Sequence, residues 1–397
     1  MMISRRNFLA VAGAAAAAAA LTACGGSSSS TSTASSTASS AASEAGSEAA
    51  SKITKVALTC DTGTIDDESF NQACWSAVSS YMGDDCQYYI PEADASDEDR
   101  ETMIRQAVND GAEVIVCVGY LYGASLAWAA EQYPDVKFIA IDVTQGDIGT
   151  DEIPSNCYCI TFKEEQAGYL AGYAIAKDGK TKLGFLGGMA VPAVVRYGYG
   201  FVQGVDAAAA DLGLTDVSLN YVYGGQFFGD ADITAVMDTW YAGGTEVVFA
   251  CGGGIYTSAV DAAKKANAKV IGVDVDQAGV IAGYAGVEGM TVTSAMKGLY
   301  PTTYDTLTDV IVNGNWDAYK GKIATLGLVS GEDPELNYVQ IPMGEGTQWS
   351  DSFTQDDYKA MVKDMFDGKI TVSNDVSKTP SDFATVIAVE DQGAIKG

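Results

Sequence analysis

Strand-length apolar segments alternate with helix-length amphipathic segments along most of the chain, and this alternation constrains the fold most strongly. One series of segments begins at Lys55 and a second at Lys182. Continuously apolar strands are buried on both faces, as in parallel sheets covered by helices. The two series therefore predict an α/β fold with two doubly wound parallel-sheet lobes.

The boundaries of the expected elements follow from the same alternation. Strands are expected at residues 55–59, 87–90, 113–118, 137–142, 157–162, 182–187, 217–223, 246–251 and 269–273. Helices are expected at residues 68–81, 97–110, 123–132, 163–177, 192–212, 231–242 and 257–266, and residues 293–297 are expected to open a later helix.

Residues 1–23 have the features of an export signal. Two adjacent arginines precede an apolar run that is too short to span a bilayer comfortably. The run ends in Leu-Thr-Ala-Cys-Gly at residues 21–25, which resembles the bacterial lipobox, in which the cysteine, here Cys24, is lipidated. The alternative is a signal peptide with an incidental cysteine. Residues 4–9 also resemble a twin-arginine signal, so twin-arginine export and ordinary secretion both stay open.

Residues 24–52 consist mainly of Ser, Ala and Thr. Such a segment cannot bury a core and behaves as a flexible tether. We therefore expect the folded body to begin near Ile53 and to be held by its lipid anchor at the extracytoplasmic face of the cell membrane.

The composition excludes several classes of function. The chain has no histidine, which excludes Ser-His-Asp and Cys-His catalysis and every His-ligated metal site. Its formal charge is −29, from 52 acidic and 23 basic residues, which argues against electrostatic binding of nucleic acid or anionic lipid. The cysteines other than Cys24 lie mostly in apolar runs, so buried free thiols are expected rather than disulfides or a zinc site. We expect no metal and no cofactor.

Polar, glycine and aromatic residues gather where the expected strands end. These segments are residues 61–72, Asp142, residues 252–254, residues 274–277 and residues 293–297. Ligands of doubly wound sheets bind beyond the carboxyl ends of the strands, and with two lobes the natural site is the cleft between them. Each segment also has a structural explanation, since acids and Ser can cap the helix after residue 67 and glycines serve in turns.

Residues 61–67 resemble the calcium-binding aspartate cluster of nucleoside hydrolases, DxDxxxDD. The second acid of that cluster is Gly63 here, so a calcium cage would lose a ligand. The chain also lacks a histidine to assist a leaving base and an evident nucleophile–base pair. We therefore expect a protein that is not an enzyme, with a nucleoside hydrolase as the less favoured alternative.

Five ordered motifs carry a closer resemblance over about residues 53–345. They are residues 61–72, 162–172, 184–189, 270–277 and 293–297. In these motifs the chain resembles the basic membrane protein family. This family is the purine nucleoside receptor type of ABC-transporter substrate-binding lipoprotein. The resemblance implies a type I periplasmic-binding-protein fold with a three-crossover hinge, a nucleoside held between the lobes, and a monomer.

The same resemblance implies an N-terminal lobe of residues 53–160 plus about 275–325. The C-terminal lobe would contain residues 161–274 plus about 326–397. The ligand would be a purine nucleoside such as guanosine, inosine or adenosine, and the partner an ABC permease that recognises the closed, ligand-bound form.

Ten residues are expected to bind the ligand. A base is held by stacking between aromatic rings, and its edge needs fixed donors and acceptors. The resemblance implies that Phe70 supplies one ring and that either Phe227 or Phe228 supplies the second. Base-edge candidates are Asp61, Asn71 and Asp142. The resemblance further implies Asp274 for the ribose hydroxyls, Lys297 for a ribose oxygen, and the backbone of Gly252 or Gly253 against the sugar.

The chain departs from the family at two loops. One is residues 190–192, and the other is the glycine loop, where Tyr256 is expected to reach the cleft. A different neutral ligand, a sugar or an autoinducer, bound for uptake or sensing is therefore the alternative function. No basic cluster suited to a phosphate is evident, which favours nucleosides over nucleotides.

Overall fold

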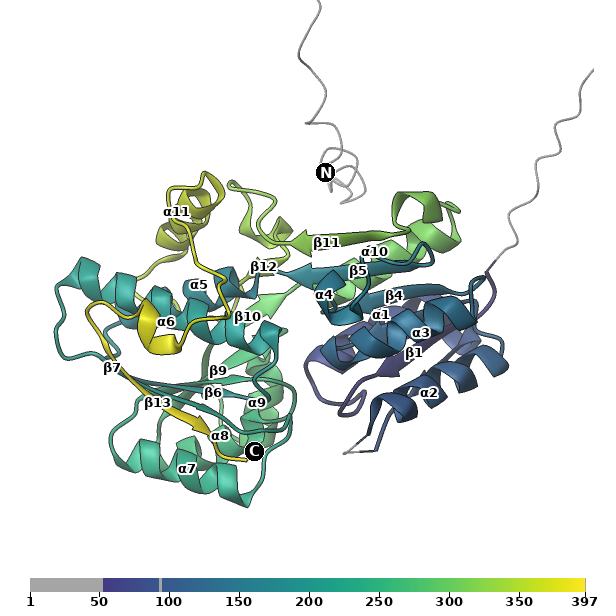
Figure 1. The fold of residues 1–397 in the computed structure, drawn as a ribbon. Coiled ribbons are helices and arrows are strands. Elements are labelled where there is room, and N and C mark those ends of the chain that lie inside the picture. The colour runs from purple at the N-terminus through teal and green to yellow at the C-terminus, as the bar shows by residue number, and fades with distance from the viewer. Residues whose placement is uncertain (1–52, 93–94, 397) are drawn as a thin grey trace, which may run out of the picture. The chain divides into compact units, whose positions relative to one another are not determined.

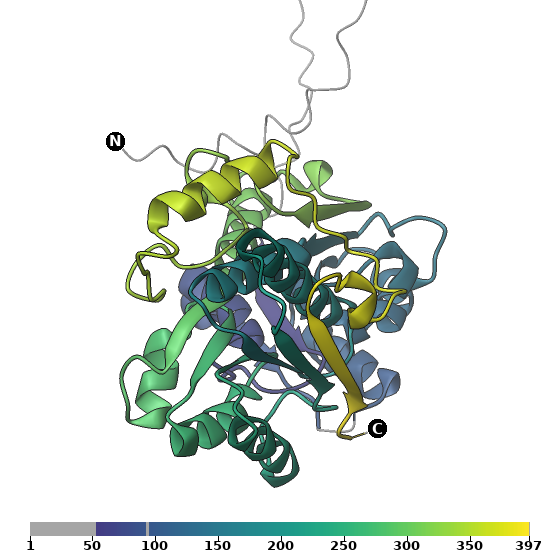
Figure 2. The ribbon, with the colours of Figure 1, turned by 90° about the vertical axis from the view of Figure 1, so that its left-hand side faces the viewer.

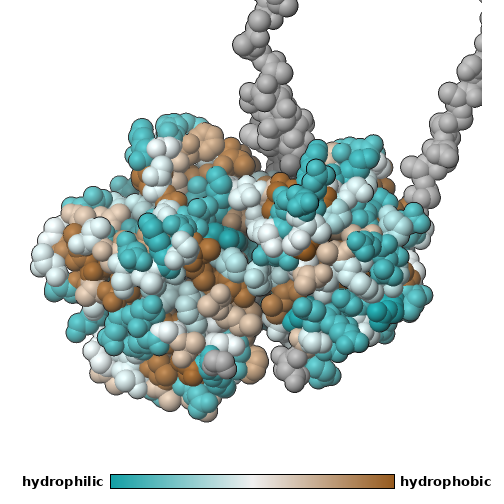
Figure 3. All heavy atoms as spheres, viewed as in Figure 1, coloured by the Kyte–Doolittle hydropathy of each residue, from teal (hydrophilic) through white to brown (hydrophobic). Residues whose placement is uncertain are grey.

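Two parallel sheets organise the chain from Ile53 onward, which forms one unit (Figure 1). The computed structural model describes residues 53–92 and 95–396. The expected signal peptide, Cys24 and the tether lie outside these residues. Among the described helices, none combines the length and apolarity that a bilayer span requires. On the face drawn in Figure 3, hydrophobic residues are dispersed among hydrophilic ones.

The first sheet has the strand order β11-β5-β4-β3-β1-β2, and all its pairs are parallel. Its strands are β1 (Val56–Cys60), β2 (Cys86–Tyr89), β3 (Val114–Val118), β4 (Lys137–Ile141), β5 (Cys157–Phe162) and β11 (Lys322–Leu326). The helices that accompany it are α1 (Phe70–Met82), α2 (Asp97–Asn109), α3 (Gly123–Gln132), α4 (Gln145–Ile148) and α10 (Leu299–Ile311). We call this part the first lobe.

The second sheet has the order β12-β10-β9-β8-β6-β7-β13 and is parallel except for β12. Its strands are β6 (Lys182–Gly187), β7 (Ser218–Tyr223), β8 (Val247–Cys251), β9 (Lys269–Asp274), β10 (Thr291–Lys297), β12 (Val339–Gln340) and β13 (Ala388–Ala394). The helices of this second lobe are α5 (Glu164–Lys177), α6 (Pro192–Leu212), α7 (Ala231–Ala242), α8 (Tyr256–Ala266), α9 (Ala278–Ala285) and α11 (Gln355–Phe366). Figure 2 shows β13 and α11 in yellow and yellow-green.

The two faces of β1 illustrate why apolar strands need helices on both sides. Val56 and Leu58 join the core that includes α1, whereas Ala57, between them, joins the core that includes α2 and α3. Successive side chains of a strand point to opposite faces, so a strand that is apolar throughout is covered twice. The expected parallel sheets are confirmed.

Three crossovers connect the lobes, as expected. The chain passes from β5 to α5, from β10 to α10 and from β11 to β12. The expected lobe boundary is wrong for residues 275–297, because α9 packs against α8 and β10 pairs with β9 in the second sheet.

The prediction that residues 293–297 open a helix is also wrong. These residues form the end of β10, and helix α10 begins only after Gly298. The first five residues of β10 are buried, and they include Thr291, Val292 and Thr293, whose β-branched side chains favour a strand. The cysteines match expectation: every one in the described residues is free, and all except Cys86 are buried.

Helices α5 and α6 pack with their backbones in contact. Glycines recur four residues apart in each helix, at Gly168 and Gly172 in α5 and at Gly200 and Gly204 in α6. A Cβ atom at any of these positions would collide with a backbone carbonyl of the opposite helix. This close packing fixes the N-terminus of α5, which enters the site described below.

We predict that Gly200→Ala destabilises the protein. Its methyl group would overlap the carbonyl of Glu165, and separating two packed helices costs on the order of 1–3 kcal/mol. Gly283→Ala in α9 is the matched control, because a Cβ there meets no atom within 4 Å and Ala favours a helix by up to about 1 kcal/mol. Urea unfolding followed by circular dichroism measures both, and equal stability of Gly200→Ala and the wild type would contradict the prediction.

Candidate functional site

A cavity of about 480 Å³ lies between the two lobes, at the carboxyl ends of strands from both sheets. The structure brings every residue predicted to bind the ligand to this cavity: Asp61, Phe70, Asn71, Asp142, Phe227, Phe228, Gly252, Gly253, Asp274 and Lys297. Tyr256, expected to reach the cleft, also lines it.

Asp61 forms part of the first-lobe wall directly after β1. Its Oδ2 accepts a hydrogen bond from the backbone N–H of Leu121 at 2.9 Å, and its carbonyl accepts one from Arg100 Nε at 3.1 Å. Burial raises the pKa of Asp61 to about 7, against the opposing effects of the Leu121 N–H and the Arg100 charge.

Asp67 caps helix α1. Its carboxylate accepts hydrogen bonds from the backbone N–H groups of Ser69, Asn71 and Gln72, each at 3.0 Å. The capping explanation of this acid is therefore confirmed. The cap presents Phe70 and Asn71, the first two residues of the helix, to the cavity.

Asn71 keeps one acceptor free. Its Nδ2 donates to the carbonyl of Thr62 at 2.9 Å. Its Oδ1 is buried and accepts no hydrogen bond from any residue that the structure describes. A buried acceptor without a partner destabilises a protein, so this atom fits a hydrogen-bond donor of a ligand.

Lys297, the last residue of β10, is the centre of a buried charge cluster. Its Nζ lies 2.6 Å from Asp142 Oδ2, 3.5 Å from Glu164 Oε1 and 3.8 Å from Asp274 Oδ1. Arg196 completes the cluster with its Nε 2.6 Å from Glu164 Oε2. Asp142 follows β4 of the first sheet and Lys297 ends a strand of the second, so this ion pair joins the lobes.

Burial and charge act in opposite directions on these groups. Burial raises the pKa of Asp142 to about 6 although the Lys297 ammonium lowers it. Burial also raises the pKa of Asp274, again against Lys297. Burial lowers the pKa of Lys297, but Asp142, Asp274 and Glu164 together raise it by more than burial lowers it. The ammonium therefore stays charged.

Asp142 and Asp274 share an unusual backbone conformation. Both are non-glycine residues with positive φ, 61° and 65°. Such residues are uncommon, although Asp tolerates the left-handed region better than most side chains. Local strain of this kind is retained at sites where a side chain must be held in place. Asp142 Oδ1, like Asn71 Oδ1, is buried with no partner in the described chain.

Aromatic rings come to the cavity from both lobes. Phe70 of the first lobe has its ring centroid 4.4 Å from Lys297 Nζ, a cation–π distance. Phe227 of the second lobe packs against the backbone at Gly188 and Gly252, where a Cβ would overlap its ring. Glycine is thus needed at both of these positions for the ring of Phe227 to pack there. Phe228 also lines the cavity but is 53% exposed.

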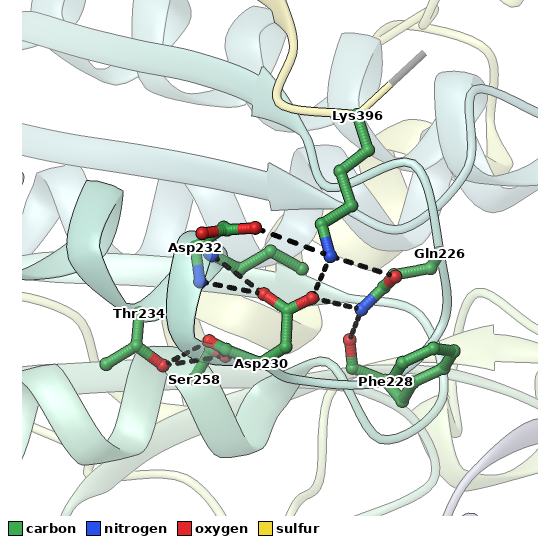
Figure 4. A network of polar contacts seen from close by, with 8 residues as sticks. Gln226, Phe228, Asp230, Asp232, Thr234, Ser258 and Lys396 are labelled. Atoms are coloured by element: carbon green, nitrogen blue, oxygen red, sulfur yellow. Dashed lines mark hydrogen bonds and ion pairs between the residues drawn. The ribbon is translucent and has the colours of Figure 1, made fainter.

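The loop that carries these two phenylalanines is anchored by Asp230 (Figure 4). Its Oδ1 caps α7 by accepting from the N–H groups of Asp232 and Ile233, both at 3.0 Å. Its Oδ2 accepts from Gln226 Nε2 at 2.9 Å and forms an ion pair with Lys396. The C-terminal end of the chain therefore braces the aromatic loop.

Four residues of the site had no predicted role at the ligand. They are Ser69, Glu164, Arg196 and Tyr197. Ser69 Oγ donates to Asp274 Oδ2 at 2.7 Å, and the Tyr197 hydroxyl lies 3.4 Å from Asp274 Oδ1. A signal existed for Glu164, since it lies in the motif at 162–172, where the chain enters the second lobe.

The cavity offers more acceptors than donors. Its polar lining contains five aspartates and Asn71 beside six Thr and Tyr residues, and Lys297 is its one cationic residue within the described chain. The described residues also contain no group of three or more His, Cys, Asp or Glu side chains that could hold a metal ion. The arrangement suits an uncharged ligand with several hydroxyl or N–H donors and a flat apolar face.

Comparison with known proteins gives one family. The family model described as ABC transporter substrate-binding protein PnrA-like matches residues 53–332. The ABC transporter nucleoside-binding protein BmpA of Lactococcus lactis is 27% identical over 338 residues, which are 80% of this chain and 88% of that protein. Basic membrane protein A of Borreliella burgdorferi is 31% identical over 234 residues, 57% of this chain and 65% of that protein.

Solved structures agree on the fold. The solute-binding protein of an ABC transporter system from Aeropyrum pernix K1 has a TM-score of 0.60 at 22% identity and covers 83% of this chain and 90% of its own. One from Conexibacter woesei has a TM-score of 0.59 at 22% identity, with coverages of 81% and 98%. The predicted periplasmic-binding-protein fold is thereby confirmed.

We predict that Lys297→Met destabilises the unliganded protein strongly near pH 8 and less at pH 5. Removing one partner of a buried ion pair costs about 3–5 kcal/mol. The pKa of Asp142 is about 6 in the folded protein and about 4 in the unfolded chain. Protonation of Asp142 therefore stabilises the fold fully below about pH 4, and this stabilisation is lost as the pH rises through about 6. Without the ammonium this pKa rises further, which steepens the pH dependence.

Thermal unfolding at the two pH values measures this effect. Lys265→Met is the control, because Lys265 pairs with Asp238 at the surface, with 60% and 41% of the two side chains exposed. Such pairs contribute at most about 1 kcal/mol. An equal loss of Tm by Lys297→Met at both pH values would show that the buried carboxylates do not depend on this lysine.

Proposed function

Since this chain belongs to the PnrA-like family of ABC transporter substrate-binding proteins, we propose that its ligand is a purine nucleoside held between the two lobes for uptake. The observation that carries the proposal is the cavity, which combines phenylalanine rings from both lobes with buried acceptors that lack partners. A nucleoside has a flat base, several N–H and O–H donors, and no charge. BmpA of Lactococcus lactis, a similar protein, is named as nucleoside-binding, which supports the same ligand class.

Phe70 and Phe227 are proposed to stack on the base. Base stacking on an aromatic side chain contributes roughly 1–3 kcal/mol per base. Phe227 is favoured over Phe228 because the backbones of Gly188 and Gly252 support its ring, whereas Phe228 is half exposed. A ring fixed before binding loses less conformational entropy when a base stacks on it.

The charge cluster is proposed to bind the sugar. Asp274 would accept hydrogen bonds from ribose hydroxyls, and Lys297 would donate to a ribose oxygen. Asp142 lies 2.6 Å from Lys297, so we now place it at the sugar and leave Asp61 and Asn71 for the base edge. Gly252 and Gly253 also line this cavity, next to the ring of Phe227.

The electrostatics favour nucleosides over nucleotides. A phosphate would enter a cavity whose lining carries Asp61, Asp142 and Asp274 besides the single ammonium of Lys297. Like charges at short distance in a partly desolvated site are strongly unfavourable. Uptake of an uncharged nucleoside avoids this repulsion.

We further propose that the chain is a lipoprotein, anchored through Cys24 at the extracytoplasmic face, that delivers its ligand to an ABC permease and breaks no bond. The sequence of residues 21–25 supports the anchor. Family membership supports a binding role rather than an enzymatic one, because the relatives are substrate-binding proteins. A monomer is sufficient, since both walls of the cavity come from one chain.

We predict that Phe70→Ala weakens nucleoside binding about 5- to 150-fold, the equivalent of one lost stacking interaction. Isothermal titration calorimetry with guanosine, inosine and adenosine measures this loss. Phe366→Ala is the matched control, because Phe366 is 48% exposed and lies outside the cavity. Unchanged nucleoside affinity of Phe70→Ala would refute the stacking role. Binding of a free sugar or an autoinducer but of no nucleoside would establish the alternative function.

We also predict that Asp274→Asn weakens guanosine binding by at least about tenfold, because a hydrogen bond to a charged acceptor contributes roughly 1.5–3 kcal/mol. The same substitution should change the affinity for 2′,3′-dideoxyguanosine much less, since that ligand lacks both hydroxyls. The two ligands and two proteins form a double-mutant cycle. Equal losses for both ligands would mean that Asp274 does not contact the ribose diol.

A further inference from the structure

We propose that Gln277, a buried residue outside the cavity lining, is a positioning residue that holds the Phe70 segment of the first lobe closed over the ligand. The proposal rests on the proposed function, because it assumes a ligand between the lobes. It adds a residue that does not touch this ligand.

The side chain of Gln277 is fixed within the second lobe. Gln277 directly precedes α9, is completely buried, and accepts a hydrogen bond from the N–H of Val273 at its Oε1, at 2.9 Å. Its own backbone N–H donates to Ser294 Oγ at 3.1 Å. Gly272 makes room for the side chain, since a Cβ there would press on it. The amide group therefore has one orientation.

The other half of the amide reaches the first lobe. Gln277 Nε2 donates to the backbone carbonyl of Glu68 at 2.9 Å. Glu68 has a φ of 54°, a left-handed conformation that is unfavourable for a glutamate. Its N–H donates to Gln72 Oε1, which keeps the residue tied to helix α1. The strained turn thus places the Glu68 carbonyl within hydrogen-bond distance of the Gln277 amide in the second lobe.

The contact lies beside the ligand-lining residues. Ser69, the next residue, donates its hydroxyl to Asp274 of the second lobe. Phe70 and Asn71 follow directly and line the cavity. Two successive residues of the first lobe therefore bond to the second lobe just before the residues that face the ligand. Both bonds join the two lobes, so they stabilise the arrangement in which the Phe70 segment is closed against the second lobe.

The test separates the two halves of the amide. Gln277→Glu keeps an oxygen for the Val273 N–H but removes the donor to Glu68 and sets an oxygen against its carbonyl. We expect guanosine to dissociate about tenfold faster in stopped-flow measurements on the full chain, the effect of one lost buried hydrogen bond. The association rate should change less, because affinity differences between variants lie mainly in dissociation.

Gln203→Glu is the matched control. Gln203 Nε2 donates to the carbonyls of Tyr199 and Ser373 and its Oε1 accepts from Ser373 N–H, all within the second lobe. This variant should unfold at a lower temperature but release guanosine at the wild-type rate. Wild-type release by Gln277→Glu would overturn the proposal, as would equal acceleration in Gln203→Glu.

A second variant and a ligand-free measurement keep the proposal testable. If Gln277→Glu does not fold, Gln277→Met, which has a similar shape and no donor, is measured in its place with the same expected acceleration. If the wild type binds no nucleoside, the proposed function fails on its own. Small-angle X-ray scattering of the ligand-free proteins then decides: a larger radius of gyration of Gln277→Met than of Gln203→Glu supports the cross-lobe role, and equal radii refute it.

Discussion

A single buried ammonium, that of Lys297, holds together the part of the molecule on which the site depends. It contacts Asp142 of the first lobe and Asp274 of the second, and Glu164 at the start of α5, directly after the first crossover. Three buried carboxylates repel one another in a medium of low dielectric constant unless a cation lies among them. Buried ion clusters add little net stability, but they define one geometry. Here that geometry is the junction of the lobes.

Strained backbone is concentrated at the same junction. Only four non-glycine residues of the described chain have positive φ, and Glu68, Asp142 and Asp274 are three of them. Each one makes or adjoins a contact between the lobes, through Gln277, Lys297 and Ser69 respectively. Strain is retained where surrounding interactions over-determine a residue. The lobes thus fix, at their contact, the positions of side chains that line the cavity.

Sequence patterns predicted the fold, and the family resemblance supplied ten of the residues that line the cavity, but neither predicted the partners of these residues. Strands such as Val114–Val118 were recognisable because they are apolar throughout, and strand ends pointed to the cleft. Residues 293–297, predicted to open a helix, instead end the strand Thr291–Lys297, because their place in the sheet comes from pairing with Val270–Asp274. Glu164 and Arg196 were missed for a different reason. Their roles come from contacts between segments far apart in the chain, which periodicity does not encode.

If the cavity holds the proposed nucleoside, the size of the ligand is coupled to the contacts between the lobes. A cavity of about 480 Å³ falls within the range of small-molecule sites, roughly 300–1,000 Å³. A larger ligand would hold the lobes apart and break the bonds of Ser69 and Gln277, which adjoin Phe70. A smaller one would leave the buried acceptors of Asn71 and Asp142 without donors. Such a site would select its ligand in two ways. The ligand must be small enough for the two lobes to stay in contact, and it must match the groups that touch it.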